Sequence, residues 1–278
     1  MTQLKCNICH KFTQFNENET WECNHCGHKY ELSKEGIFKC FDNESITDTL
    51  KWHDEAAKNI ENPAHSIVGY RLSIHQKNIL KTFLKINYGE TSNILDVGCG
   101  NGNFASEVMK VLNVNKVFGV DFSMEQLKRI NQKKVTSFHA SAENLPFGDN
   151  QFSLVYCIEV IQNIKYINST LTEIARVTKQ DGLIAISSLY SGSLLRKLIN
   201  ILDPNNSEKD YCLRVKGEPD IYLRSPKDIS DILEKTGLKY EGVYWIFSPL
   251  NYSKFSKSKS SKYFSLFAQN FLCLFRKA

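Results

Sequence analysis

The chain has 278 residues, of which 42% are hydrophobic and 23% charged, the usage of an ordinary globular protein. This length is enough for one large domain with a smaller one, and for a core without disulfides. No apolar run reaches the about 18–20 residues that span a bilayer, and the first residues lack the apolar stretch of a signal peptide. We therefore expect a cytoplasmic protein with no transmembrane segment.

The net charge of +5 is unevenly distributed. Residues 1–50 hold 5 basic and 8 acidic side chains, whereas residues 251–278 hold 6 basic side chains and no acidic one. A solvated basic end explains this pattern, so the charge does not by itself indicate a nucleic-acid partner.

Residues 1–45 are rich in cysteine and are expected to form a zinc ribbon. Two C-x2-C pairs, Cys6 with Cys9 and Cys23 with Cys26, are separated by thirteen residues. Each pair can wrap one side of a tetrahedral zinc, and four thiolates close its coordination shell, so we expect a structural ion. The nearby residues His10, His25 and His28 are alternative ligands that four cysteines make unnecessary. Cys40 is interpreted as a small apolar residue.

Residues 46–90 are expected to form a helical linker or substrate lid. Thr47 or Asp48 is a candidate cap for a helix that runs through Lys58. Apolar residues at helical spacing predict a second helix between Leu72 and Leu84. Trp52, Tyr70 and Arg71 are candidate acceptor-binding residues of this segment.

Residues 91–278 alternate strand and helix patterns, which predicts a parallel sheet with helices on both faces. The predicted strands are 93–97, 116–121, 135–139, 152–157 and 183–188, and the predicted helices between and after them are 103–112, 124–133, 163–178 and 226–236. Residues 238–247 and 270–278 are expected to be two paired closing strands, with a short helix at 262–269. The Ser- and Lys-rich stretch at 253–262 is interpreted as a mobile connector.

The segment Asn-Ile-Leu-Asp96-Val-Gly98-Cys-Gly100-Asn-Gly102 carries the chemistry. An apolar strand ends in an acid, and glycines then allow the backbone to turn and to approach a ligand closely. Neither the dinucleotide fingerprint nor a phosphate-binding P-loop is complete, since Asn103 replaces the third glycine and no Gly-Lys-Ser/Thr follows. Asp121 ends the next strand, 21 residues after Gly100, where a carboxylate usually binds ribose hydroxyls.

These motifs resemble those of class I S-adenosylmethionine (SAM)-dependent methyltransferases of the type 11 kind, in the family's order and spacing. The matching segments are 95–104, 120–123, 141–161, 182–188 and 225–243. The resemblance implies a Rossmann-like seven-stranded sheet over 91–278. Residues 28–41 likewise resemble the end of zinc ribbons that are fused to methyltransferases.

The resemblance also implies roles for individual residues. Asp96 with the amides around Gly98 and Gly100 is expected to face the methionine part of SAM, and Asp121 to bind the ribose. Phe122 is expected to pack beside the adenine, and the backbone of Ala142 to contact the adenine edge. Cys157 is expected to offer its carbonyl to the cofactor's amino group. Three of these residues also have a purely structural interpretation: Asp96 as a helix cap, Phe122 as a core residue and Cys157 as a buried strand residue.

A catalytic base is not identified by the sequence. Where quinone-pathway methyltransferases have Glu-His, this chain has Gln162-Asn163. Glu159 and His139 are candidates, for which a structural role is the preferred interpretation. The segment 190–224 contains aromatic and basic residues that suit an anionic or aromatic acceptor, or a solvated surface: Tyr190, Arg196, Tyr211, Arg214, Tyr222 and Arg224.

Three functions remain open from the sequence. The preferred one is a SAM-dependent methyltransferase that acts on a small-molecule or lipid-like acceptor. The second is a methyltransferase of rRNA or tRNA bases, because some rRNA guanine methyltransferases carry a similar ribbon that ends in Lys-Glu-Gly, like residues 34–36. The acidic ribbon argues against it, because phosphate contacts require Lys and Arg. The third is a non-catalytic SAM-binding adaptor. The oligomeric state is not predicted.

Overall fold

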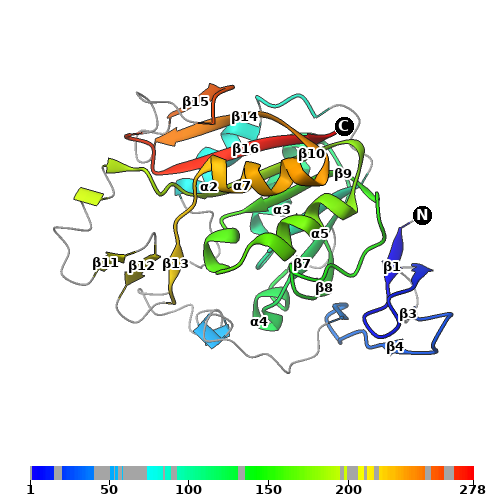
Figure 1. Cartoon of the computed structure of the whole chain (residues 1–278). Helices are drawn as coiled ribbons and strands as arrows, with labels where there is room; N and C mark the ends of the chain where they lie inside the picture. The colour runs from blue at the N-terminus through cyan, green and yellow to red at the C-terminus, as the bar shows by residue number, and fades with distance from the viewer. Residues whose placement is uncertain are drawn as a thin grey trace.

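The computed structural model describes residues 2–15, 21–40, 51, 52, 54, 55, 58, 74–83, 85–88, 93–130, 135–194, 197, 198, 206–209, 212–215, 219–247, 252–259 and 266–278. The candidate cap at 47–48, Tyr70, Arg71, Arg196 and Tyr211 lie outside these residues. A nine-stranded sheet with helices on both faces organises the chain (Figure 1).

Five parallel strands form the centre of this sheet, in the order β8-β7-β6-β9-β10. Their residues are Ile94–Val97 (β6), Val117–Asp121 (β7), Val135–His139 (β8), Phe152–Ile158 (β9) and Thr178–Leu189 (β10). Nearly every residue of β6, β7 and β9 is buried, as expected for strands covered on both faces. All five strands were predicted, and β10 begins earlier than expected.

Two antiparallel strands complete the predicted set of seven. The last strand, β16 (Asn270–Lys277), lies between β10 and β14 (Leu238–Phe247). This confirms the predicted pairing of the two closing segments. An additional strand, β15 (Tyr252–Ser256), pairs with β14, so the expectation of a connector is wrong for this part of 253–262. Residues 266 and 267 form a turn, and 266–269 hold none of the helix expected at 262–269.

Helices cover the two faces of the sheet as separate layers (Figure 1). On one face, α2 (Ile74–Phe83) and α3 (Asn103–Leu112) contribute to one hydrophobic core. On the other, α5 (Asn168–Val177) and α7 (Pro226–Leu233) contribute to a second core. The capping box at Ser225 begins α7, and Gly237 ends the following turn η3 (Glu234–Thr236) with a positive φ, as predicted. Two shorter elements are α4 (Met124–Leu127) and η2 (Ile161–Asn163).

The amino-terminal ribbon extends the sheet. Its strands are β1 (Gln3–Lys5), β2 (Phe12–Gln14), β3 (Trp21–Glu22), β4 (Lys29–Tyr30) and β5 (Phe38–Lys39). The strand β5 pairs in parallel with the edge strand β8, so β5 and β15 raise the predicted seven strands to nine. The ring of Phe38 stacks on Phe138 at 5.2 Å, and Cys40 donates its backbone N–H to the His139 carbonyl. The ribbon thus covers an edge that would otherwise expose unpaired backbone groups.

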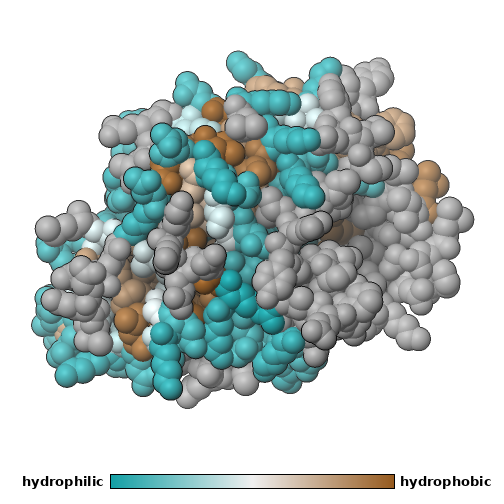
Figure 2. Space-filling view, turned by 180° about the vertical axis from the view of Figure 1, so that it is seen from behind, coloured by the Kyte–Doolittle hydropathy of each residue, from teal (hydrophilic) through white to brown (hydrophobic). Residues whose placement is uncertain are grey.

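A small sheet in the segment after β10 was not predicted. It consists of β11 (Asn206–Lys209), β12 (Cys212–Val215) and β13 (Ile221–Tyr222). Seen from behind, the described surface is mostly hydrophilic, with separate apolar patches (Figure 2). Among the described residues, no helix is long and apolar enough to cross a membrane.

Candidate functional site

The glycine loop connects β6 to α3 at the carboxyl end of the sheet. Gly98, Gly100 and Gly102 all have positive φ, which favours glycine over residues with side chains. A Cβ atom at Gly98 would lie 2.2 Å from Val160 Cγ2, so a side chain does not fit there. The backbone N–H groups of Gly98 and Cys99 both donate to the Val120 carbonyl, at 2.7 and 3.0 Å. The loop therefore lies directly against the ends of β7 and β9.

Asp121 is held at the end of β7 by the same loop. Its two carboxylate oxygens accept backbone N–H groups from Gly100 and Ser123, each at 2.8 Å. Burial raises the pKa of Asp121 to about 6, an effect that these two bonds oppose and that the nearby Asp54 carboxylate increases. An acid in this position can accept hydrogen bonds from ligand hydroxyls.

Asp96 has an unsatisfied oxygen. The residue is 2% exposed, and its Oδ2 has no hydrogen-bond partner in the described structure. Burial and the neighbouring Asp121 carboxylate raise the pKa of Asp96. The Tyr156 hydroxyl opposes this rise in pKa. A buried carboxylate with one unsatisfied oxygen is still costly, and a cationic amine beside it would restore charge balance and hydrogen bonding. The donor set therefore fits the amino acid part of SAM.

The remaining predicted residues surround this pair. Phe122 directly follows Asp121, and its carbonyl lies 3.0 Å from His139 Nε2 on β8. Ala142 is partly buried against the core, in the loop after β8. Cys157 is buried on β9 next to Tyr156, the partner of Asp96 in the sheet register. The structure brings all seven predicted residues to one end of the sheet, where β6 and β9 form the topological switch point.

Asp54 is a site residue that sequence reasoning missed. It belongs to the described helical positions of 51–58, which confirms a helix in this segment. Its carboxylate accepts a hydrogen bond from the Ser123 hydroxyl and adds to the negative charge around Asp121. Trp52 lies in the same helix and is partly buried. No motif marks Asp54, because it reaches the site only through the tertiary packing of a helix distant in sequence.

The four predicted zinc ligands converge in the ribbon. The sulfur atoms of Cys6, Cys9, Cys23 and Cys26 all lie within 4.8 Å of one another. The Cys6–Cys26 and Cys9–Cys23 sulfur pairs are 3.6 and 3.5 Å apart. Four thiolates about 2.3 Å from a tetrahedral zinc have sulfurs roughly 3.8 Å apart, so the geometry fits that ion.

Other residues of the ribbon support thiolate character at two of these positions, Cys6 and Cys23, whereas the neighbouring sulfurs raise the pKa of Cys9 and Cys26. The Tyr30 hydroxyl lies 3.2 Å from Cys6 Sγ, and the Thr13 hydroxyl lies 3.8 Å from Cys23 Sγ. Burial opposes ionisation of Cys23, but the backbone N–H groups of His25 and Cys26 outweigh it and lower the pKa of Cys23 to about 6. Such outer contacts orient metal ligands and stabilise their charge.

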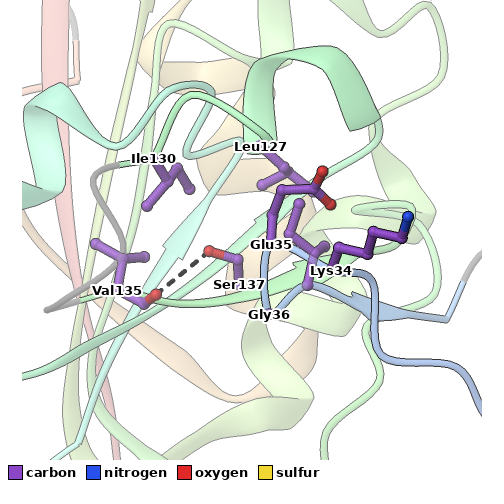
Figure 3. Close-up of a pocket in the computed structure, with 8 residues that line it drawn as sticks. Lys34, Glu35, Gly36, Leu127, Ile130, Val135 and Ser137 are labelled. Atoms are coloured by element: carbon purple, nitrogen blue, oxygen red, sulfur yellow. Dashed lines mark hydrogen bonds between the residues drawn. The ribbon is translucent and has the colours of Figure 1, made fainter.

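A cavity of about 310 Å³ lies between the ribbon and the large domain (Figure 3). The ribbon contributes half of its lining, and α4, the residues after it and β8 contribute the rest: Lys34, Glu35, Gly36, Ile37, Leu127, Ile130, Val135 and Ser137. The Ser137 hydroxyl donates to the Val135 carbonyl at 3.3 Å. The cavity begins at the first residue of β8, whereas Asp121 pairs with His139 at the other end of that strand. It is therefore separate from the Asp96–Asp121 site.

The candidate acceptor residues of 190–224 have structural partners where they are described. The Tyr190 ring packs edge-on against Trp245 at 4.9 Å. Arg224 donates to the carbonyls of Ile164 and Lys165. Arg214 lies on β12, and its side chain is outside the description. An acceptor-binding role for this segment stays a prediction.

Comparisons with known proteins agree with this fold and site. Residues 95–186 match a family described as a methyltransferase domain. A malonyl-[acyl-carrier protein] O-methyltransferase from Buchnera aphidicola is 32% identical over 117 residues, which cover 41% of this chain and 44% of that protein. A demethylmenaquinone methyltransferase from Staphylococcus saprophyticus is 32% identical over 116 residues, which cover 39% of this chain and 48% of that protein.

A solved structure from Thermotoga maritima, described as a SAM-dependent methyltransferase and possible histamine N-methyltransferase, shares the fold. Its TM-score is 0.59 at 16% identity, over 82% of this chain and 99% of that one. The chain therefore has the fold that is found in this structure of a SAM-dependent methyltransferase. The segment that matches the methyltransferase domain family, residues 95–186, contains the glycine loop, Asp121 and Cys157. The chain spans about half the length of the curated relatives it matches.

Proposed function

We propose that this chain is a SAM-dependent methyltransferase that acts on a small-molecule acceptor. The observation that carries the proposal is the pair of buried acids at the switch point, Asp96 with an unpartnered oxygen and Asp121 bonded to the glycine loop. We assign Asp96, Gly98 and Gly100 to the methionine part of the cofactor, and Asp121, Phe122, Ala142 and Cys157 to its nucleoside part. Relatives named for malonyl-acyl-carrier-protein and demethylmenaquinone support a small acceptor.

The chain's own residues would bind and orient both reactants. SAM supplies a methyl group on a positively charged sulfur, which is already electrophilic. Asp96 would anchor the amino acid end of SAM and Asp121 its ribose, so the chain would hold the cofactor at both ends. Alignment of the acceptor atom with this methyl is the main contribution expected of the protein. In this proposal residues 1–45 form the structural zinc ribbon, 46–90 the lid and 91–278 the catalytic domain.

The test is release of S-adenosylhomocysteine by the purified, zinc-loaded chain. The acceptor panel contains a demethylated naphthoquinol, a malonyl-acyl-carrier protein and an rRNA transcript. Turnover on a small molecule or acyl carrier supports the proposal. Turnover on the transcript alone would contradict the acceptor class, and SAM binding without any turnover would favour a non-catalytic adaptor.

A further inference from the structure

Glu159 lies at the junction between the cofactor loop and the other half of the sheet. It directly follows β9 and has a φ of 59°, a conformation that few non-glycine residues adopt. The next residue, Val160, fills the space beside Gly98. The backbone N–H of Glu159 donates to Ser187 Oγ on β10 at 3.0 Å. The backbone on both sides of Glu159 is therefore fixed, and strained residues of this kind often occur at functional sites.

The side chain of Glu159 extends away from the Asp96–Asp121 pair. Asn270 Nδ2, at the first residue of β16, donates to Glu159 Oε1 at 2.9 Å. β16 lies on the far side of β10 from β9, so this carboxyl group lies over the half of the sheet that is free of predicted cofactor residues. Asn270 is fully buried, and its Oδ1 has no hydrogen-bond partner in the described structure. An unsatisfied buried oxygen beside a carboxyl group is a position where a bound water or a polar ligand group would be stabilised.

The environment of Glu159 suits proton transfer near neutral pH. Burial raises the pKa of Glu159 to about 7, and the residue still keeps some exposed surface. A base is most effective when its pKa is close to the working pH. The other candidate base, His139, lies against Phe122 on the ribose side.

We propose that Glu159 is the proton acceptor of the transfer, taking the proton from the O–H or N–H of the methyl acceptor. This inference rests on the proposed function. The acceptor oxygen or nitrogen forms the new bond to the methyl carbon, and the electron pair of the broken bond stays on sulfur. The proton leaves the acceptor for the Glu159 carboxylate, so charge and atoms balance without a further reactant. Asn270 positions the carboxylate by holding Oε1.

The test uses two cofactor analogues and needs no acceptor. Sinefungin has a carbon with a protonated amine where SAM has its methylated sulfur, whereas S-adenosylhomocysteine is uncharged at that position. Calorimetry gives the ratio of the Kd values of the two analogues for the wild type and for Glu159→Gln. The charge-matched control is Glu107→Gln, which changes a partly exposed side chain of α3. We expect Glu159→Gln to lower the preference for sinefungin over S-adenosylhomocysteine by roughly threefold to tenfold, because a nearby carboxylate stabilises the cationic amine of sinefungin. The control should keep the wild-type ratio.

The same ratio measured against pH tests whether Glu159 titrates. In the wild type the preference for sinefungin should rise through about pH 7, and in Glu159→Gln it should stay flat. Asp54, Asp96, Asp121 and His139 also lie at this end of the sheet, on the side assigned to the amino acid and ribose parts, which the two analogues share. A ratio that Glu159→Gln leaves unchanged, or a flat wild-type profile, would overturn the role of Glu159. Failure of both analogues to bind the wild type would instead contradict the proposed function.

Discussion

At the scale of single residues, the site is built from charges that the fold leaves only partly satisfied. Asp121 has both oxygens occupied by backbone N–H groups and still has a raised pKa. Asp96 has a buried oxygen with no partner in the described structure. Such groups cost stability, and a ligand that satisfies them regains part of that cost as binding free energy. In the proposed function, the two acids would therefore bind a cationic ligand with hydroxyl groups.

Substitution of Asp121 should weaken SAM binding without unfolding the domain. Asp121→Ala removes the carboxylate that would accept hydrogen bonds from the ribose hydroxyls, and it leaves the Gly100 N–H without its acceptor. Loss of a hydrogen bond to a charged group costs about 1–3 kcal/mol. We expect the Kd of SAM to rise roughly fivefold to 150-fold by calorimetry. Asp231→Ala, which removes an exposed ion pair of α7, is the matched control. An unchanged Kd for Asp121→Ala would refute the ribose assignment.

Glu159→Gln should make the ligand-free protein more stable at high pH. The Glu159 carboxyl ionises near pH 4.5 when unfolded and near pH 7 when folded. Between these values only the unfolded chain loses the proton, so the wild-type free energy of unfolding falls as pH rises, while glutamine avoids this loss. We expect a gain of about 1–3 kcal/mol at pH 8 and none near pH 4.5, from urea denaturation at both pH values. An equal change in the free energy of unfolding at pH 8 and at pH 4.5 would contradict the raised pKa of Glu159.

The motif residues could be predicted from sequence because each is local to one turn. Asp96, the loop glycines and Asp121 follow strands that hydrophobic patterning identifies. Asp54 and Asn270 could not be predicted, because they reach the site from elements far apart in the chain, and only the sheet order brings them there. The raised pKa of Glu159 depends on burial, which sequence spacing does not reveal.

At the scale of elements, the carboxyl-terminal strand β16 is central to the sheet. Pairing with β10 on one side and β14 on the other makes β16 an internal strand with almost every residue buried. Its hydrophobicity is therefore explained by packing in the core. In sequence, a basic Ser/Lys stretch before an apolar end resembles a membrane anchor. Only the pairing with β10 and β14 distinguishes a core strand from such an anchor.

Truncation at Ser261 should therefore destabilise the whole large domain. Removal of β16 exposes the edges of β10 and β14 and deletes several buried side chains, each worth about 1.5–3 kcal/mol. We expect an insoluble protein, or one without a cooperative thermal transition, whereas removal of Ala278 alone should have little effect. A truncated protein with unchanged Tm that no longer sediments with anionic vesicles would show a membrane role instead.

The ribbon should depend on zinc for its folding. Its strands have two or three residues each, too few to bury a core, so metal binding should supply the folding energy. We expect one zinc per chain by elemental analysis. Cys23→Ser or chelation should unfold residues 2–40 and leave the seven-stranded sheet intact, as followed by hydrogen exchange. Metal-free protein whose β5 amides stay fully protected from hydrogen exchange would contradict zinc-dependent folding of the ribbon.

At the scale of the whole molecule, the sheet joins the ribbon and the large domain into one structure. The strand β5 is the ninth member of the sheet, and it borders the strand that carries His139. Sequence patterning predicted the seven core strands, since their apolar runs are continuous. The added edge strands β5 and β15 could not be predicted, because two residues give no periodicity and a Ser/Lys-rich strand resembles a connector.

The most direct test is calorimetric titration of the folded, zinc-loaded chain with SAM. We expect saturable binding of one SAM molecule per chain, competed by S-adenosylhomocysteine and weakened when Asp96 is replaced by Asn. The Asn variant keeps the size of the side chain but loses the charge that the cofactor's amine would neutralise. Absence of binding by folded wild-type protein, or equal affinity of Asp96→Asn and wild type, would contradict the account.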